Sequence, residues 1–211
     1  MSCVGVFFLC MGHYYMARID PLEETEFSEE LKKQFSFIEE TMGFVPNSLK
    51  TMARIPGLVS AFTHLSSVIL GNTILPSELR GMIALMASTG AECRYCQAHT
   101  SATAARAGVT DEKLSDIWNF ESSEHFNDSE RAALRFAFHS GQVPNAVTDF
   151  DTETLQKYFT DQEITSIISI CSLFGYLNRW NDTMATKLED HPKNFASDIL
   201  GPHGWEPSKH S

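Results

Sequence analysis

The stretch Glu92-Cys93-Arg94-Tyr95-Cys96-Gln97-Ala98-His99 lies near the middle of the 211-residue chain, between two helical patterns. It places two cysteines three residues apart and a histidine three residues after the second one. On a helix, residues at this spacing share one face, so Cys93 and Cys96 would be neighbours and His99 would lie one turn beyond. The stretch therefore predicts a helix that begins at a dithiol and carries an imidazole beside it.

Such a helix start is suited to thiol chemistry. Unpaired backbone N–H groups and the helix dipole favour a thiolate in the first turn, where Cys93 would lie. His99, with an ordinary pKa of about 6.5, can accept the proton of Cys96 or stabilise its thiolate. One sulfur can then be oxidised to a sulfenic acid, with which the other condenses to a disulfide. Two other interpretations stay open: a pair of small buried hydrophobic residues, and a zinc site on both cysteines and His99, which lacks a fourth ligand.

The rest of the chain is dominated by helical periodicity, and no convincing strand alternation is present. A thioredoxin fold is disfavoured because no strand precedes the cysteines. Residues 191–211, rich in proline and glycine, are expected to form a loop-like tail packed on the surface. The sequence thus predicts an all-α bundle with the cysteine pair at the start of a central helix. The expected helices span about 28–42, 48–54, 56–70, 76–88, 93–107, a segment from 110, 128–141, 151–158 and 161–188.

Composition limits the possible partners. The formal net charge is −11 and the pI is about 5.1, so the chain would repel nucleic acid and anionic membrane surfaces. Five cysteines with one close pair do not form a secreted disulfide framework, which favours a reducing, cytoplasmic location. The length suits one domain, expected at residues 16–190. Residues 1–15 are interpreted as a disordered extension or a misassigned start, with a cleaved signal as the alternative.

Several further motifs accompany the cysteine stretch. They are Gly43-Phe44-Val45-Pro46-Asn47, Met52-Ala53-Arg54-Ile55-Pro56, Leu75-Pro76, Gly108, and Leu173-Phe174-Gly175-Tyr176-Leu177-Asn178-Arg179-Trp180-Asn181-Asp182. With them the chain resembles the carboxymuconolactone decarboxylase superfamily, in its alkylhydroperoxidase D-like, peroxidase-related branch. The resemblance covers residue 16 to the C-terminus. It implies an AhpD-like helical bundle, a homo-oligomer of two or more subunits, and a peroxide-reducing dithiol.

The resemblance also implies a role for each cysteine. Cys96 would attack the peroxide as a thiolate, Cys93 would resolve the sulfenic acid, and an unidentified thiol reductant would reduce the disulfide. No organic cofactor and no metal are expected. A relay glutamate of redox members is expected about twelve residues before the first cysteine, where this chain has Gly81, and Glu78 one turn earlier is the candidate substitute. His99 lies three residues after the second cysteine, whereas alkylhydroperoxidase D has its histidine at four.

Two residues complete the candidate pocket. Tyr95 is expected to pack, with a hydroxyl that can reach the pocket, and Asn181 is expected on a late helix that either packs against neighbours or lines the pocket. The sequence therefore predicts a peroxidase or disulfide oxidoreductase with antioxidant activity. Two alternatives are a non-enzymatic redox sensor or interaction protein on the same scaffold, and a decarboxylase or lyase. The last is disfavoured by the intact cysteine pair, on which the founding activity does not depend.

Overall fold

The computed structural model describes residues 17–211, and in that range every regular element is helical. The N-terminal extension expected at residues 1–15 lies outside the described residues. The α-helices are α1 (Glu29–Met42), α2 (Asn47–Met52), α3 (Leu58–Leu70), α4 (Ser77–Gly90), α5 (Arg94–Arg106), α6 (Asp111–Ser115), α7 (Asp128–Gly141), α8 (Asp149–Leu155), α9 (Asp161–Met184) and α10 (Asp190–Ile199). This confirms the predicted all-α bundle, and none of these helices is long and apolar enough to cross a membrane.

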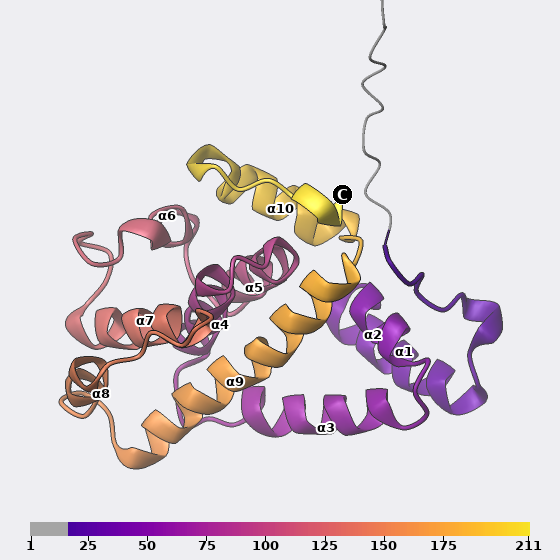
Figure 1. Cartoon of the computed structure of the whole chain (residues 1–211), viewed down its shortest axis with the longest axis horizontal. Helices are drawn as coiled ribbons and strands as arrows, with labels where there is room; N and C mark the ends of the chain where they lie inside the picture. The colour runs from indigo at the N-terminus through magenta and orange to yellow at the C-terminus, as the bar shows by residue number, and fades with distance from the viewer. Residues whose placement is uncertain (1–16) are drawn as a thin grey trace, which may run out of the picture.

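Helix α4 is the centre of the larger hydrophobic core. It packs against α5, α7 and α9, and the long α9 crosses the molecule diagonally beneath α5 (Figure 1). Residues 81–89 of α4 are all buried, so this part of the helix is enclosed on every side. Met82, Ile83 and Leu85 are completely shielded from solvent. Helix α5, which begins just after Cys93, is therefore packed against a deeply buried helix.

The close contact between α4 and α7 depends on a glycine at the end of each helix. A Cβ atom on Gly90 would lie 2.0 Å from the carbonyl oxygen of Phe138, and one on Gly141 would lie 2.1 Å from that of Ala87. Both obstacles are backbone atoms, which cannot rotate away as a side chain can. The two helices can approach this closely only without side chains at these positions.

We expect Gly141→Ala to destabilise the protein, because the new methyl group forces α7 away from α4. Overpacking of this kind lowers the free energy of unfolding by about 2–3 kcal/mol, which is about 4–12 °C in Tm for a chain of this size. Gly175→Ala is the matched control: Gly175 is also helical, in α9, but a Cβ there meets nothing within 4 Å. It should raise stability by about 0.5–1 kcal/mol through helix propensity. Equal effects in thermal unfolding would contradict the close packing.

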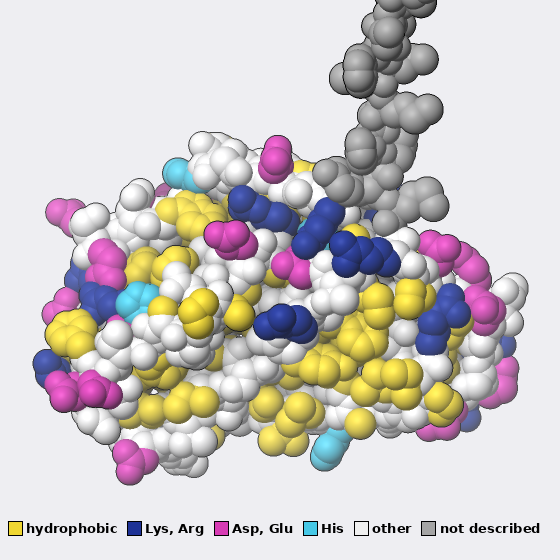
Figure 2. Space-filling view, viewed as in Figure 1, with side chains coloured by type: hydrophobic (Ala, Val, Ile, Leu, Met, Phe, Trp, Pro, Cys, Tyr) yellow, Lys and Arg dark blue, Asp and Glu magenta, His cyan; other side chains and the backbone are white. Residues whose placement is uncertain are grey.

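A second, smaller core joins the N-terminal helices. Its buried residues are Phe35, Ile38, Leu49, Met52 and Val59, from α1, α2 and α3. Figure 2 shows hydrophobic side chains gathered over α3 and the neighbouring part of α9. Leu65 and Val68 of α3 are about half exposed, at 50% and 59%, and Tyr176 of α9 is 41% exposed. The homo-oligomer implied by the family resemblance stays a prediction. This exposed apolar face is a surface on which contacts between subunits can be tested.

Helix α8 spans Asp149–Leu155 rather than the expected 151–158, and the largest differences from the sequence-based expectation lie after residue 184. Helix α9 ends at Met184 rather than 188, because Ala185 adopts a left-handed conformation (φ 48°) and donates to Asn181 O. The segment after it is not a surface loop. It forms α10, whose first turn accommodates Pro192, and it inserts Leu200, Trp205 and His210 into the interior. The proline and glycine residues of this segment indicated a loop, but burial of the apolar side chains of Leu200 and Trp205 outweighs that tendency.

Candidate functional site

The cysteine pair lies at the start of α5, in the core. Cys93 is the N-cap residue of α5, and its carbonyl accepts the first helical hydrogen bond from Gln97 N, at 2.9 Å. The preceding Glu92 has a left-handed backbone (φ 56°), which turns the chain sharply out of α4. Cys93 and Cys96 are 0% and 2% exposed, and both are free thiols. The predicted placement of the pair at the N-terminus of a central helix is thus observed.

The two thiols lie three residues apart at the start of α5 and influence each other electrostatically. Burial raises the pKa of the Cys93 thiol well above its usual range, and its hydrogen bond to Cys96 and the nearby charge of Cys96 act in the same direction. Cys93 therefore keeps its proton and donates it toward Cys96. On the other side Asn181, from α9, donates Nδ2 to the sulfur of Cys96 at 3.4 Å. Asn181 is thus the side chain of α9 that contacts the sulfur of Cys96 directly.

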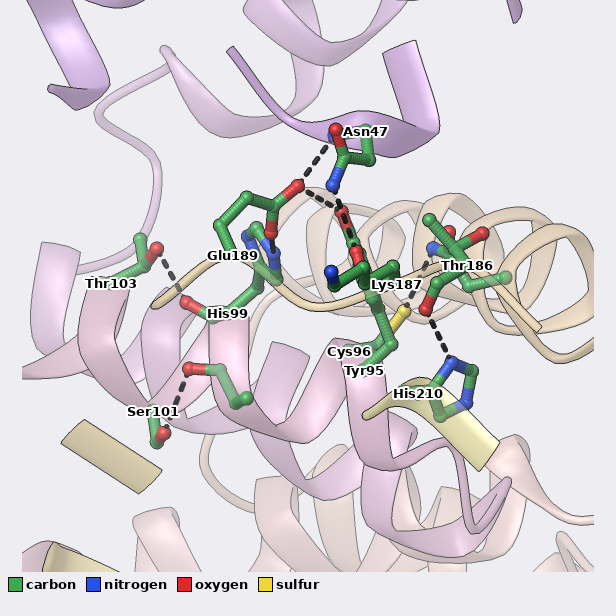
Figure 3. A network of polar contacts seen from close by, with 12 residues as sticks. Asn47, Tyr95, Cys96, His99, Ser101, Thr103, Thr186, Lys187, Glu189 and His210 are labelled. Carbon is green, nitrogen blue, oxygen red and sulfur yellow. Dashed lines mark hydrogen bonds and ion pairs between the residues drawn. The ribbon is translucent and has the colours of Figure 1, made fainter. Parts of the chain in front are cut away.

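A buried carboxylate organises the residues that follow Cys96. Glu189 lies between α9 and α10, with a side chain that is 12% exposed. One oxygen, Oε2, accepts from Nε2 of His99 at 2.7 Å, and the other, Oε1, accepts from the hydroxyl of Tyr95 at 2.9 Å. The backbone N–H of Asn47 also donates to Oε1, at 2.5 Å (Figure 3). The network therefore fixes both side chains of α5, and the rings of Tyr95 and His99 stack with centroids 4.4 Å apart.

The same contacts determine the protonation of the network. Burial acts to raise the pKa of Glu189, but the charge of His99 and the hydrogen bonds from His99 and Asn47 outweigh it, so the pKa is lowered. Burial and the charge of Glu189 raise the pKa of the Tyr95 hydroxyl well above its usual range. Glu189 is thus a carboxylate and Tyr95 a neutral donor. Because the carboxylate only accepts, Nε2 of His99 carries a proton.

The early end of α9 explains how Glu189 reaches α5. After Ala185 the chain runs back across α5, where Leu188 N donates to His210 O at 2.9 Å and Asn47 Nδ2 donates to Lys187 O at 3.0 Å. These bonds hold the segment in an extended form until α10 begins at Asp190. A helix through residue 188, as the sequence predicts, would carry Glu189 away from His99.

The structure does not bring Glu78 to the cysteines. Glu78 is exposed at the start of α4, where it accepts a hydrogen bond from Ser77 at 2.9 Å. Gly81 faces α5 at a different point, because a Cβ there would lie 2.8 Å from Cα of Ala104. Position 81 is therefore a site of close helix packing with no room for a glutamate. The buried carboxylate beside His99 is Glu189, from the opposite end of the fold.

A second histidine and carboxylate lie next to Cys93. Asp182 of α9 accepts from Nε2 of His210 and from Nζ of Lys209, both at 3.2 Å. Burial acts to raise the pKa of Asp182, but the hydrogen bonds from His210 and Lys209 outweigh it and lower the pKa. The ligand atoms of Cys93, Asp182 and His210 lie within 4.8 Å of one another. Each thiol therefore has polar side chains of α9 beside it.

Four of these residues carry no assigned role in the sequence-based prediction. Asn47 and Asp182 belong to motifs that carry the family resemblance, so a signal for them was present. Glu189 and His210 lie outside every motif, in a segment that reads as a surface tail. Their side chains become recognisable only when the C-terminal segment is seen to fold back on α5.

A polar cleft of about 1010 Å³ opens beside this region. Its lining includes Asp182, Asn178 and Lys209, together with the turn after α4 at Ala91 and Glu92. Because Asp182 lies next to Cys93, the carboxylate separates the cleft from the buried thiol. The cleft therefore reaches Asp182 but is not lined by either cysteine.

Comparison with known proteins places the chain among others of the same fold. The debrominase Bmp8 is 32% identical, with a TM-score of 0.79 over 90% of this chain and 99% of that one. A peroxidase-related protein with an alkylhydroperoxidase AhpD core, from Ralstonia eutropha JMP134, is 23% identical, with a TM-score of 0.75 over 85% and 95%. Uncharacterized protein YnjA of Escherichia coli K12 is 24% identical over 67% of this chain and 79% of its own length.

The sequence profile of the carboxymuconolactone decarboxylase family matches residues 56–138, from the turn before α3 into α7. This region contains both cysteines and His99, whereas Asn181, Glu189 and His210 lie beyond it. The likeness to Bmp8, however, extends over nine tenths of the chain. By its sequence and by its AhpD-like fold, the chain belongs to the carboxymuconolactone decarboxylase family.

Proposed function

We propose that the protein is a thiol-dependent oxidoreductase in which Cys93 and Cys96 alternate between a dithiol and a disulfide. The observation that carries the proposal is the placement of two buried free thiols three residues apart at the start of α5, with Asn181 donating to the sulfur of Cys96. Two thiols at this Cys-X-X-Cys spacing can alternate between a dithiol and a disulfide. The third cysteine of the described residues, Cys171, is buried elsewhere in α9 and belongs to no such pair.

The chemistry with a peroxide proceeds in two steps. The thiolate of Cys96 attacks one peroxide oxygen and breaks the O–O bond, which yields a sulfenic acid on Cys96 and, after uptake of one proton, an alcohol. The thiol of Cys93 then attacks the sulfenic sulfur, and a disulfide and one water molecule form. The two sulfurs have given up two electrons in total. An external dithiol or two thiols return them by exchange with the disulfide.

The side chains around the pair have distinct parts in this proposal. Asn181 stabilises negative charge on Cys96 through its Nδ2 hydrogen bond. His99 and Glu189 form a proton relay in this proposal. Glu189 orients the His99 ring through its hydrogen bond with Nε2, and Nδ1 of His99 takes the proton of Cys96 and returns it to the leaving oxygen. The raised pKa of Cys93 supports the roles that the family resemblance implies, because Cys93 stays a thiol until it resolves the sulfenic acid on Cys96.

A second substrate class is favoured by the Bmp8 likeness, since a cysteine-to-alanine variant of that debrominase, 31% identical to this chain, was solved in complex with 2,3,4-tribromopyrrole. For a bromoarene, the thiolate of Cys96 takes the bromine, and the ring carbon takes a proton. Cys93 then displaces bromide from the sulfur and the same disulfide forms. The substrates differ, but both reactions remove two electrons from the same pair.

The direct test is peptide mapping after one equivalent of peroxide. Trypsin cleaves after Arg94, between the two cysteines, so Cys93 lies in peptide 81–94 and Cys96 in peptide 95–106. A disulfide must join these two peptides into one species that dithiothreitol separates. We expect this species in wild type and in Cys171→Ser, the control. Peptides that stay separate and unoxidised, or a sulfenic acid on Cys171 alone, would refute the proposal.

A further inference from the structure

Three potential metal ligands converge behind the wall of the cleft. They are the sulfur of Cys93, a carboxylate oxygen of Asp182 and an imidazole nitrogen of His210, all within 4.8 Å of one another. They come from three separate parts of the chain: the N-cap of α5, the last turn of α9, and the short 3-10 helix Ser208–His210. Such convergence of Lewis bases from distant segments is typical of a cation site, because without a cation or protons they repel one another.

The ring of His210 is oriented as in metal-binding histidines. Its Nδ1 lies 2.8 Å from the backbone carbonyl of Thr186 (Figure 3). A carbonyl only accepts, so Nδ1 carries a proton, and Nε2 is the nitrogen that faces Asp182 at 3.2 Å. A ligating histidine usually donates its other ring N–H to a carbonyl or carboxylate, which fixes the tautomer and orientation. His210 is completely buried, so this arrangement is part of the folded core.

The ligand set also selects a class of metal. One thiolate, one imidazole and one carboxylate suit Zn²⁺ and chemically similar divalent ions, and not Ca²⁺ or Mg²⁺, which prefer oxygen ligands alone. Three protein ligands leave the fourth tetrahedral position open. Asp182 and Lys209 line the 1010 Å³ cleft, so an ion and a water ligand have an entry path from that side.

We propose that Cys93, Asp182 and His210 form a binding site for Zn²⁺ or a similar divalent transition-metal ion. This ligand set differs from the zinc interpretation of the sequence, in which His99 was a ligand, because His99 is bonded to Glu189. The ion replaces the proton on the Cys93 sulfur and the proton that Nε2 of His210 donates to Asp182, and both protons are released to solvent. Metal binding and the Cys93–Cys96 disulfide exclude each other, because both use this sulfur.

Lys209 competes with a metal ion for the carboxylate of Asp182, so a substitution of Lys209 is a useful control. Its ammonium group lies 3.2 Å from the same Asp182 oxygen, and its side chain is 35% exposed. An ion that binds Asp182 must displace this positive charge, which can move into solvent. Lys209→Gln is therefore expected to strengthen metal binding, opposite in direction to the loss of a ligand. A merely structural disturbance of the C-terminal segment would weaken binding in every variant.

The test is titration of the reduced, full-length protein with Co²⁺ under anaerobic conditions, followed by competition with Zn²⁺. We expect one equivalent of Co²⁺ with a thiolate-to-cobalt absorption band. Cys93→Ser should abolish the band, and His210→Gln and Asp182→Asn should weaken binding at least about tenfold. His191→Gln and Cys171→Ser are the controls that should bind as wild type. Absence of the band in wild type, or its persistence in Cys93→Ser, would overturn the proposal.

If a variant does not fold, the proposal can still be tested by a measurement on the wild-type protein alone. Zinc X-ray absorption should show one sulfur at about 2.3 Å and nitrogen or oxygen ligands at about 2.0–2.2 Å. Two sulfur ligands would mean that Cys93 and Cys96 hold the ion together, which overturns this ligand set. Neither experiment uses an oxidant, so the metal-site proposal and the dithiol proposal are tested independently. Failure of the peroxide mapping does not affect the metal site, and failure of the metal titration does not affect the dithiol.

Discussion

Cys96→Ser is expected to abolish thiol-dependent reduction of both peroxide and 2,3,4-tribromopyrrole, with a loss of about two orders of magnitude or more, as for other essential nucleophiles. The reason is that Cys96 is the proposed nucleophile: its sulfur accepts a hydrogen bond from Asn181, whereas burial raises the pKa of Cys93 and keeps that residue a thiol. Serine is similar in size, but its hydroxyl is a far weaker nucleophile than a thiolate. The measurements are peroxide consumption and bromide release, each with dithiothreitol as reductant.

The Cys93→Ser variant tests whether Cys96 attacks the substrate and Cys93 resolves the sulfenic acid. This variant should still form one sulfenic acid on Cys96, trapped with a dimedone-type reagent, but it should not turn over at the wild-type rate. Burial raises the pKa of Cys171 to about 12, so it stays a thiol and Cys171→Ser should keep wild-type activity. Full activity in Cys96→Ser would reject the dithiol mechanism. A sulfenic acid on Cys93 instead would reverse the two roles.

Glu189→Ala is expected to destabilise the protein by about 3–5 kcal/mol, the usual range when one partner of a buried charged pair is removed. Glu189 accepts hydrogen bonds from His99, Tyr95 and the backbone of Asn47, and its loss leaves these donors without a partner. Urea unfolding of wild type and variant measures the change. Glu78→Ala is the matched control, because Glu78 is an exposed glutamate bonded only to its neighbour Ser77.

The control should change stability by less than about 0.5 kcal/mol and should keep wild-type turnover. If Glu78→Ala impairs peroxide reduction while Glu189→Gln does not, the relay suggested by sequence spacing is correct and the one proposed from the structure is wrong. Glu189→Gln is the milder variant for this purpose, because it keeps the shape of the side chain. It retains one acceptor oxygen but cannot hold the charge opposite His99.

The same carboxylate makes stability depend on pH in a defined direction. The pKa of Glu189 is lower in the folded protein than its ordinary value of 4.5, so the unfolded chain binds more protons in acid. The stabilisation is complete above the ordinary value and is lost as the pH falls through the lowered folded value. Glu189→Gln lacks this contribution, so its free energy of unfolding should fall less steeply below about pH 4.5 than that of wild type.

The boundaries of most helices were predictable because local chemistry sets them. Ser28, Asn127 and Thr160 each cap a helix through a side-chain hydrogen bond, at the places where sequence spacing indicates a helix start. Cys93, Cys96 and His99 were found for a similar reason, since their spacing of three residues fixes their common face on any helix. Contacts of this kind span one or two turns and need no knowledge of the rest of the fold.

Only the tertiary structure decided which carboxylate lies beside His99. Sequence spacing predicts the carboxylate at position 81. The space beside Gly81 is filled by Ala104, 23 residues further along the chain, so no side chain fits there. Glu189 and His210 reach α5 because Ala185 ends α9 in a left-handed turn, and burial of Leu200 and Trp205 draws the C-terminal segment inward. The sequence by itself determined the dithiol and its helix, because these depend on near neighbours. The side chains that surround the dithiol depend on long-range packing, which leaves no periodic signal in the sequence.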